Sequence, residues 1–210
     1  MLPPPRAERV LRCLLGLVVL GFGLALMVAA DLGLAPWDVL HQGLSERIGV
    51  PIGTTGIFVG MLVLLAWIPL RERVGLGTVL NVVVIGATID LTLLWLDTPE
   101  WVGWKLAFLV AGTYLWGPGS SLYIGAGIGS GPRDGLMTAL ARRGLPVGRV
   151  RFGLELCVLT AGWLLGGTVG IGTVLFTMGI GPIIAWWLPK LALVVPEPPE
   201  PPRSRANLAR

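Results

Sequence analysis

The chain has 210 residues, of which 54% are hydrophobic and 13% are charged, and its formal net charge is +4. A soluble domain carries about 25% charged residues, so the composition excludes a soluble enzyme, a disordered chain and a disulfide-stabilised secreted domain. The two cysteines lie in apolar stretches, at spacings that match neither a metal site nor a redox motif.

Six apolar segments are long enough to cross a bilayer, whose hydrocarbon core of about 30 Å requires about 20 helical residues. Arginines precede the first segment, as in a signal peptide, but its apolar run is too long for one and five further segments follow. The segments are residues 11–30, 52–70, 77–96, 101–124, 150–167 and 172–188. The predicted fold class is therefore all-α, a polytopic membrane bundle of six transmembrane helices.

The distribution of Lys and Arg predicts the orientation. With the N-terminus inside, 14 of the 16 basic side chains fall on the cytoplasmic side, and Arg47 and Lys105 fall outside. Cytoplasmic loops of membrane proteins are enriched in these residues. We therefore expect a multi-pass protein of the bacterial inner membrane with both termini in the cytoplasm. The positive charge reflects this orientation, and no nucleic-acid partner is expected.

A short polar segment that begins with proline follows the first and the fourth predicted span. Each segment is too short to cross a bilayer, and proline favours the first turn of a helix. We therefore expect short helices near residues 36–46 and 132–143. The sequence leaves open whether these helices re-enter the membrane or lie at its surface.

The second half of the chain repeats the first. Residues 33–40 align with 129–136 at their Gly, Pro, Asp and Leu positions, and residues 74–80 match 169–175 at all but one position. Each half holds three spans. Because three is odd, the second half is predicted to enter the membrane from the opposite face, which gives two inverted repeats.

The predicted domain boundaries follow from this repeat. The first repeat covers residues 1–98 and the second covers 99–195. Residues 196–210 are rich in proline and arginine and have no apolar periodicity, so they are predicted to form a disordered cytoplasmic tail.

The repeated motifs resemble a known family. Gly-x-x-Pro-Trp-Asp-x-Leu at residues 33–40, its counterpart at 129–136 and the two Gly-x-Gly-Thr turns are similar to motifs of the YczE/YitT family of small bacterial integral membrane proteins. The resemblance covers about residues 10–190. The chain is too short for the soluble C-terminal domain of many YitT-type members, so it resembles the YczE branch. The resemblance implies a transporter-like inner-membrane protein and supplies no catalytic residues.

Asp38 and Asp134 are candidate site residues because both lie two positions after a helix-starting proline. In one interpretation each carboxylate caps its short helix, where free N–H groups and the helix dipole favour negative charge. In the other, two half-helices dip into the membrane and line a pathway. The two interpretations are compatible. A terminus already filled by a carboxylate attracts an anion less, which favours a neutral or cationic solute.

Polar side chains within the predicted spans complete the candidate substrate-binding or coupling set. Acidic groups in lipid cost about 2.5–3.5 kcal/mol, so they usually face the bundle interior or water. Glu155 forms either a local ion pair with Arg151, four residues earlier, or a proton- or cation-coupling site. Asp90 has no charged neighbour on its own helix and needs a partner elsewhere, which makes it the strongest candidate for a functional acid. Asn81 and Arg133 are the remaining members.

Several features predict no further chemistry. His41 is expected to be an exposed loop residue, because no second His or Cys stands nearby. The Gly-x-Gly-Thr turns lack the lysine and the preceding strand of a phosphate loop, so they are interpreted as helix-packing turns. The sequence shows no nucleophile–base set, metal-ligand cluster or cofactor fingerprint, and we expect no enzymatic activity, cofactor or metal.

The expected function is passive or secondary transport, through a transporter-like or channel-like protein, of a small neutral or cationic solute. The alternative is a non-transporting membrane partner that supports the assembly or regulation of another protein or pathway. A polar cavity between the halves favours transport, whereas a dry seam favours the partner role. The expected partners are the lipid bilayer and a small molecule or ion. The sequence leaves open the solute, the direction, the coupling ion and the oligomeric state, a homo-oligomer included.

Overall fold

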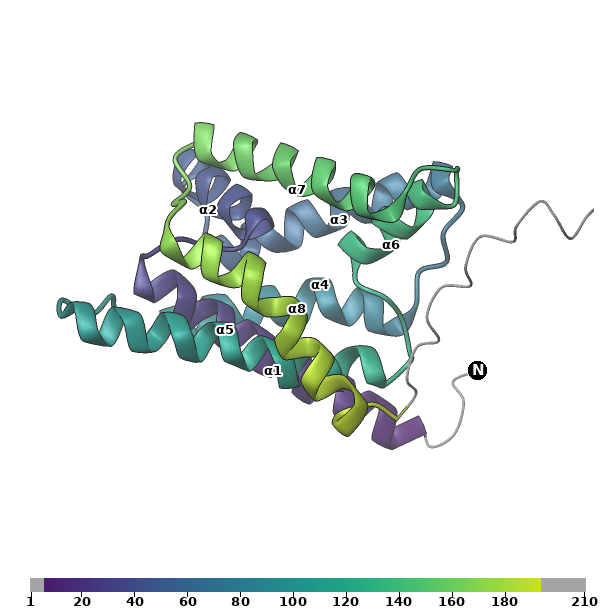
Figure 1. The fold of residues 1–210 in the computed structure, drawn as a ribbon, viewed down its shortest axis with the longest axis horizontal. Coiled ribbons are helices and arrows are strands. Elements are labelled where there is room, and N and C mark those ends of the chain that lie inside the picture. The colour runs from purple at the N-terminus through teal and green to yellow at the C-terminus, as the bar shows by residue number, and fades with distance from the viewer. Residues whose placement is uncertain (1–5, 194–210) are drawn as a thin grey trace, which may run out of the picture.

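The computed structural model describes residues 6–193, so the predicted tail at 196–210 lies outside the described residues. Within residues 6–193 the chain forms eight helices and no strand (Figure 1). They are α1 (Arg6–Ala30), α2 (Pro36–Ile48), α3 (Ile52–Leu70), α4 (Leu76–Leu93), α5 (Val102–Gly125), α6 (Pro132–Ala141), α7 (Val147–Leu164) and α8 (Ile171–Leu191). The six apolar segments and the two short proline-started segments therefore all form the predicted helices.

Within the described residues, four helices meet the combined criteria of length and apolar composition for a membrane span: α1, α3, α4 and α8. The other two long helices are less apolar. α7 carries Arg149, Arg151 and Glu155, while α5 includes Tyr, Trp and Ser side chains among its 24 residues. The structure is thus an all-helical bundle with several membrane-compatible helices.

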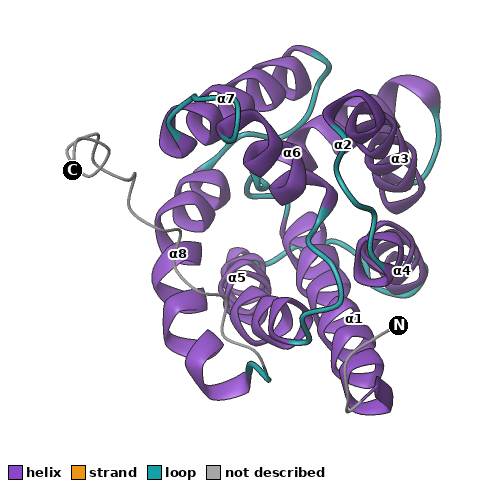
Figure 2. Cartoon of the chain, turned by 90° about the vertical axis from the view of Figure 1, so that its right-hand side faces the viewer, coloured by secondary structure: helices purple, strands orange, loops and turns teal. Residues whose placement is uncertain are grey.

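α1 and α5 pack against each other along the centre of the bundle. A Cβ atom added to Gly16 would collide with the backbone of Gly119, and one added to Gly23 would collide with the backbone of Gly112. Because the earlier glycine of one helix meets the later glycine of the other, the two helices run antiparallel. α4 packs on α1 and α8 packs on α5, which builds the lower layer seen in Figure 2.

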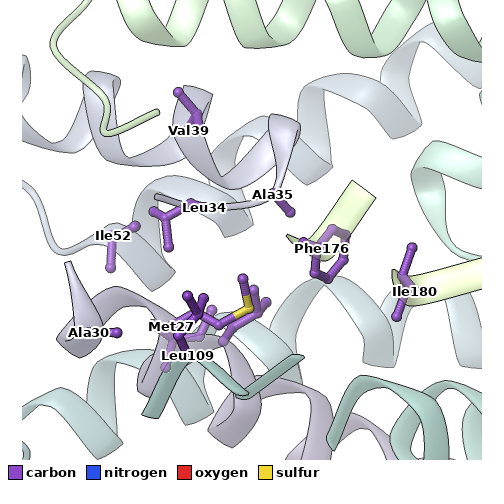
Figure 3. Close-up of a cluster of buried hydrophobic side chains, with 11 residues drawn as sticks. Met27, Ala30, Leu34, Ala35, Val39, Ile52, Leu109, Phe176 and Ile180 are labelled. Atoms are coloured by element: carbon purple, nitrogen blue, oxygen red, sulfur yellow. The ribbon is translucent and has the colours of Figure 1, made fainter. Parts of the chain in front are cut away.

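The largest apolar cluster lies where these helices meet the start of α2. Met27 of α1, Leu109 of α5 and Phe176 of α8 point toward one another below Leu34 and Ala35, which lead into α2 (Figure 3). These side chains are buried, so the start of α2 rests on an apolar floor.

The two short helices lie toward opposite ends of the bundle (Figure 1), and each is held by a long helix from the other half of the chain. α2 packs on α7, where Gly162 leaves room for the backbone of Val39. α6 packs on α3, where the ring of Trp67 covers Gly135 and its indole N–H donates a 3.1 Å hydrogen bond to the carbonyl of Pro132. The two halves are therefore interleaved.

The Gly-x-Gly-Thr turns hold the loops that precede the short helices, again across halves. Gly77 N–H donates to the carbonyl of Ile128 at 3.0 Å, and Gly172 N–H donates to the carbonyl of Leu32 at 2.8 Å. The loop around Leu32 can approach the start of α8 this closely because Gly33 adopts a φ of +107°, a conformation that favours glycine. We call these two contacts the reciprocal turn contacts. They confirm that the turns serve helix packing.

The halves differ in how their last two helices pack. In the first half α3 lies against α4, and a Cβ atom added to Gly53 or Gly86 would collide with the carbonyl oxygen of the other. The aligned glycines of the second half are Gly148 on α7 and Gly181 on α8. Within residues 6–193 a Cβ atom added to either meets no atom within 4 Å, and no comparable packing joins α7 to α8. We call these regions the α3–α4 seam and the α7–α8 seam.

Candidate functional site

A cavity of about 430 Å³ lies between the two halves, and each of the eight described helices contributes to its wall. Apolar side chains from α1, α3, α4 and α8 form much of the lining. Polar and ionisable side chains gather where the two short helices reach the cavity; they are Asp38, His41, Asn81, Ser120, Tyr123, Arg133, Asp134, Arg151 and Glu155. The cavity therefore combines an apolar wall with a concentrated group of charges and hydrogen-bonding groups.

The first turns of α2 and α6 meet in this cavity. Arg133 Nη2 lies 3.3 Å from Asp38 Oδ1, so an ion pair joins the two helices. The same guanidinium lies over the ring of Trp37, 5.1 Å from its centroid. His41 Nδ1 lies 3.2 Å from the same oxygen of Asp38. Both short helices thus start at the centre of the site and extend away from it.

Asp38 and Asp134 both lie in the first turn of their helices, as the capping interpretation requires, but within the described residues neither carboxylate accepts a hydrogen bond from the backbone there. The residues before Pro36 and Pro132 adopt an extended conformation, and neither helix start has a side-chain cap within the described chain. The partners of the Asp38 carboxylate are Arg133 and His41 instead. Asp38 therefore links the two short helices.

Asp38 and His41 lie on a short helix, outside the membrane-spanning helices, and their protonation follows from burial and from Arg133. Burial alone would raise the pKa of Asp38, but the charges of Arg133 and His41 and the hydrogen bonds outweigh burial and hold this pKa below its ordinary value. Burial, aided by Arg133, lowers the pKa of His41 against the opposing effect of Asp38. At neutral pH a charged Asp38 therefore faces Arg133 beside a neutral His41.

A second charged group lines the cavity next to this pair. Arg151 Nε donates to Glu155 Oε1 at 2.9 Å, which is the local ion pair that the four-residue spacing predicts. Asp134 faces the cavity and keeps accessible surface there, although protein surrounds it. Burial raises the pKa of Asp134 above its ordinary value, and the nearby Arg133 and Arg151 oppose this shift only in part.

Several buried polar atoms of the cavity wall have no hydrogen-bond partner among residues 6–193. They are Trp37 Nε1, Asp38 Oδ2, Trp116 Nε1 and Tyr123 OH. Buried polar groups in proteins are nearly always hydrogen-bonded to protein or water, and leaving one unpaired costs about 1–3 kcal/mol. Two N–H donors, one carboxylate oxygen and one hydroxyl group of cavity-lining residues are therefore buried without a partner among the described residues.

Comparison with known proteins places the chain in a family. The model of a family described as "Family of unknown function (DUF6198)" matches residues 7–189. The chain belongs to this family. An "Uncharacterized protein" of Haemophilus influenzae is 40% identical to it over 176 residues, which cover 83% of this chain and 81% of that protein. No solved structure matches this chain.

A further relative names the class of protein. The "Uncharacterized membrane protein YczE" of Bacillus subtilis is 35% identical over 178 residues, which cover 83% of each chain. This similarity confirms the resemblance to YczE-like proteins. Together with the long apolar helices, it identifies the chain as a helical membrane protein.

Six of the seven residues predicted for the site line the cavity. They are Asp38, Asn81, Arg133, Asp134, Arg151 and Glu155. The repeated Pro-x-Asp motif and the polar residues within apolar segments were the signals that found them. Their binding of a solute stays a prediction. His41, Trp37, Trp116 and Tyr123 also line the cavity and were not predicted.

His41 corrects an expectation, because it is buried with an exposed fraction of 6% and is not an exposed loop residue. The expectation rested on the absence of a nearby His or Cys. The signal that finds His41 is its spacing from Asp38, since residues three apart on a helix are neighbours.

Asp90 lies outside the cavity wall. Its carboxylate accepts hydrogen bonds from Gly53 N at 2.6 Å, Thr54 N at 2.7 Å and Thr54 Oγ1 at 2.6 Å. Asp90 therefore has a partner on another helix, as the sequence predicted. This partner is the N-terminus of α3, and no charged side chain among residues 6–193 takes part. Asp90 holds α3 on α4 at the α3–α4 seam.

Asp90→Ala is expected to lower the free energy of unfolding by about 0.5–2 kcal/mol, the range for losing a helix cap. Gly53 and Thr54 would lose the acceptor of their N–H groups. Asp90→Asn, which keeps one acceptor oxygen, is expected to fall between Ala and wild type. Asp97→Ala, in the exposed loop after α4, is the matched control. Thermal unfolding in detergent measures the effect, and equal stability of Asp90→Ala and Asp97→Ala would contradict the assignment.

Proposed function

We propose that this protein carries a small neutral or cationic solute across the bacterial inner membrane, by passive or secondary transport and without chemical conversion of the solute. One observation carries the proposal: polar and ionisable side chains line the cavity between the halves, and several of these residues have a buried polar atom without a partner among the described residues. A protein that serves only as a membrane partner has no need of such a cavity. The polar wall therefore favours transport over the partner role.

We extend the proposal to the architecture. The six long helices each span the membrane, both termini lie in the cytoplasm, and residues 1–98 and 99–195 form inverted repeats. The α1–α5 contacts support this arrangement. At the offset that aligns residues 33–40 with 129–136, Gly16 aligns with Gly112 and Gly23 aligns with Gly119, so the contacts Gly16–Gly119 and Gly23–Gly112 exchange with each other. Inverted repeats of this kind place the transport site between the halves near mid-membrane.

The charges of the cavity support the proposed class of solute. Arg133 and Arg151 are each paired with a carboxylate, whereas one oxygen of Asp38 has no partner within the described chain. This oxygen favours a solute that offers a hydrogen-bond donor or a positive charge over an anion. Glu155, on the cavity wall, is the residue that we assign to proton or cation coupling.

Osmotic swelling of proteoliposomes tests the proposal. Glycerol and urea serve as neutral probes, methylammonium and choline as cationic probes, and acetate as the anionic probe. We expect at least one neutral or cationic probe to enter faster than in protein-free liposomes and acetate to enter at the same rate in both. Asp38→Asn is expected to reduce the faster entry, while Asp97→Asn leaves it unchanged.

Two results of this assay would argue against the proposal. Equal entry of every probe with and without protein would overturn transport and leave the partner role. Faster entry of acetate alone would overturn the assigned class of solute. If an imposed pH gradient changes the rate in wild type and equally in Glu155→Gln, then Glu155 has no part in coupling.

A further inference from the structure

The α3–α4 seam and the α7–α8 seam carry the same small residues but differ in packing. Gly53 and Gly86 are buried against each other, whereas the aligned Gly148 and Gly181 are both exposed. Glycines at a helix contact allow close approach of two backbones. The second half therefore has the surface needed for the same close contact, and in this structure the contact is not made.

The α7–α8 seam, in which the two helices are not in close contact, borders the cavity. Gly181 and Ile184 of α8 line the cavity on one side, and Arg151 of α7 lines it on the other. The neighbouring Pro182 lies inside α8 and lacks the N–H that would continue the helical hydrogen bonds, so α8 can bend here. Cavity-lining residues lie on both sides of Pro182, Phe176 before it and Ile184 after it, so a bend at this point would change the shape of the cavity wall.

Hydrogen bonds to a carboxylate hold the α3–α4 seam together, and the α7–α8 seam has no counterpart of this carboxylate. Asp90 accepts hydrogen bonds from Gly53 and Thr54 across the α3–α4 seam. The residues aligned with Asp90 and Thr54 are Ala185 and Arg149. The asymmetry of the sequence thus matches the asymmetry of the structure: the seam with the carboxylate is closed.

We propose that this structure is one of two states of a gate, and that in the other state α8 closes on α7 while α3 separates from α4. The inference rests on the proposed function, since the exchange would expose the same cavity to opposite faces of the membrane in turn. In the proposed orientation, the state described here is closed at the outer seam and open at the cytoplasmic one. Closing the second seam places Gly181 against Gly148 as Gly86 lies against Gly53.

Disulfide cross-linking in membranes tests the gate at positions chosen from the closed seam. A Cβ atom added to Gly60 lies 3.6 Å from Cβ of Val82, within the range of disulfide bonds. A disulfide bond in the variant Gly60→Cys/Val82→Cys therefore reports that the α3–α4 seam is closed. The residues aligned with these are Glu155 and Thr177, so Glu155→Cys/Thr177→Cys reports the α7–α8 seam.

All cysteine pairs are introduced into a parent variant in which Cys13→Ala and Cys157→Ser remove the native thiols. After denaturation, the free thiols are counted from the gel shift that a polyethylene-glycol maleimide produces. Thermal unfolding of each variant checks that it is folded. Leu156→Cys/Met178→Cys is the matched control, because these side chains lie one residue further along α7 and α8 and are exposed.

We expect both reporter pairs to lose two thiols per molecule under mild oxidation, and the control pair to lose none. With all four cysteines in one chain, we expect each molecule to lose two thiols and keep two, because the seams close in alternation. The gate is overturned if the Gly60/Val82 pair cross-links while the Glu155/Thr177 pair stays reduced, if all four thiols are lost together, or if neither pair reacts.

The same proteoliposomes separate this inference from the proposed function. Alternating cross-links without accelerated entry of any probe would support the gate and overturn transport. Accelerated entry with a permanently reduced α7–α8 pair would support transport and overturn the gate.

Discussion

Gly53→Ala is expected to destabilise the protein by about 3 kcal/mol, the upper end of the range for overpacking a tight contact. Its added Cβ would collide with the carbonyl oxygen of Gly86 and with the carboxylate of Asp90. The methyl group thus separates α3 from α4 and displaces the cap of α3. Thermal unfolding of the purified protein in detergent measures the loss.

The repeat supplies a matched control for this prediction. Gly148→Ala makes the same change at the aligned position, where the added Cβ has open space in the described structure. Replacing a helical glycine by alanine there is expected to be neutral or to stabilise by about 0.5–1 kcal/mol. If the two variants lose equal stability, the packing difference between the seams does not exist in solution.

Arg133→Met is expected to destabilise the protein by about 3 kcal/mol, the lower end of the range for removing one partner of a buried ion pair. The lower end applies because 30% of the Arg133 side chain is exposed, whereas only 4% of Asp38 is. The variant leaves the Asp38 carboxylate buried without Arg133, next to His41. Unfolding experiments at neutral pH measure the effect.

Two further variants show whether the pairing is responsible. Adding Asp38→Asn to Arg133→Met removes the uncompensated charge, so the double variant is expected to be more stable than Arg133→Met alone. Arg151→Met breaks the pair with Glu155, in which 59% of the arginine side chain is exposed, and is expected to change stability by about 0–1 kcal/mol. A double variant that is less stable than Arg133→Met would contradict the ion-pair assignment.

The helices were predictable because their signals are local. An apolar run of sufficient length predicted each long helix, as at residues 77–96, where α4 covers Leu76–Leu93. Pro36 and Pro132 marked the first turns of the two short helices. The repeated motif and the polar residues within apolar segments also indicated six of the nine polar and ionisable side chains named above for the cavity.

Asp90 and His41 show why the rest could not be predicted. The groups that bind the Asp90 carboxylate lie 36 and 37 residues earlier in the chain, and no periodicity reports a contact between two helices at that separation. His41 is buried because α2 is covered by helices from elsewhere in the chain. The aligned glycines of the two halves do not reveal the difference between the seams, since both halves contain them.

The reciprocal turn contacts have a consequence for how such a molecule is assembled. Gly77 supplies a donor to the loop around Ile128, and Gly172 supplies one to the loop around Leu32, so neither half satisfies its own loop. In the proposed inverted-repeat arrangement, a single three-span unit would be complete only when paired with a second unit inserted in the opposite direction. Joining the two units in one polypeptide fixes their ratio at one to one and removes the need for oppositely oriented subunits to meet by lateral diffusion.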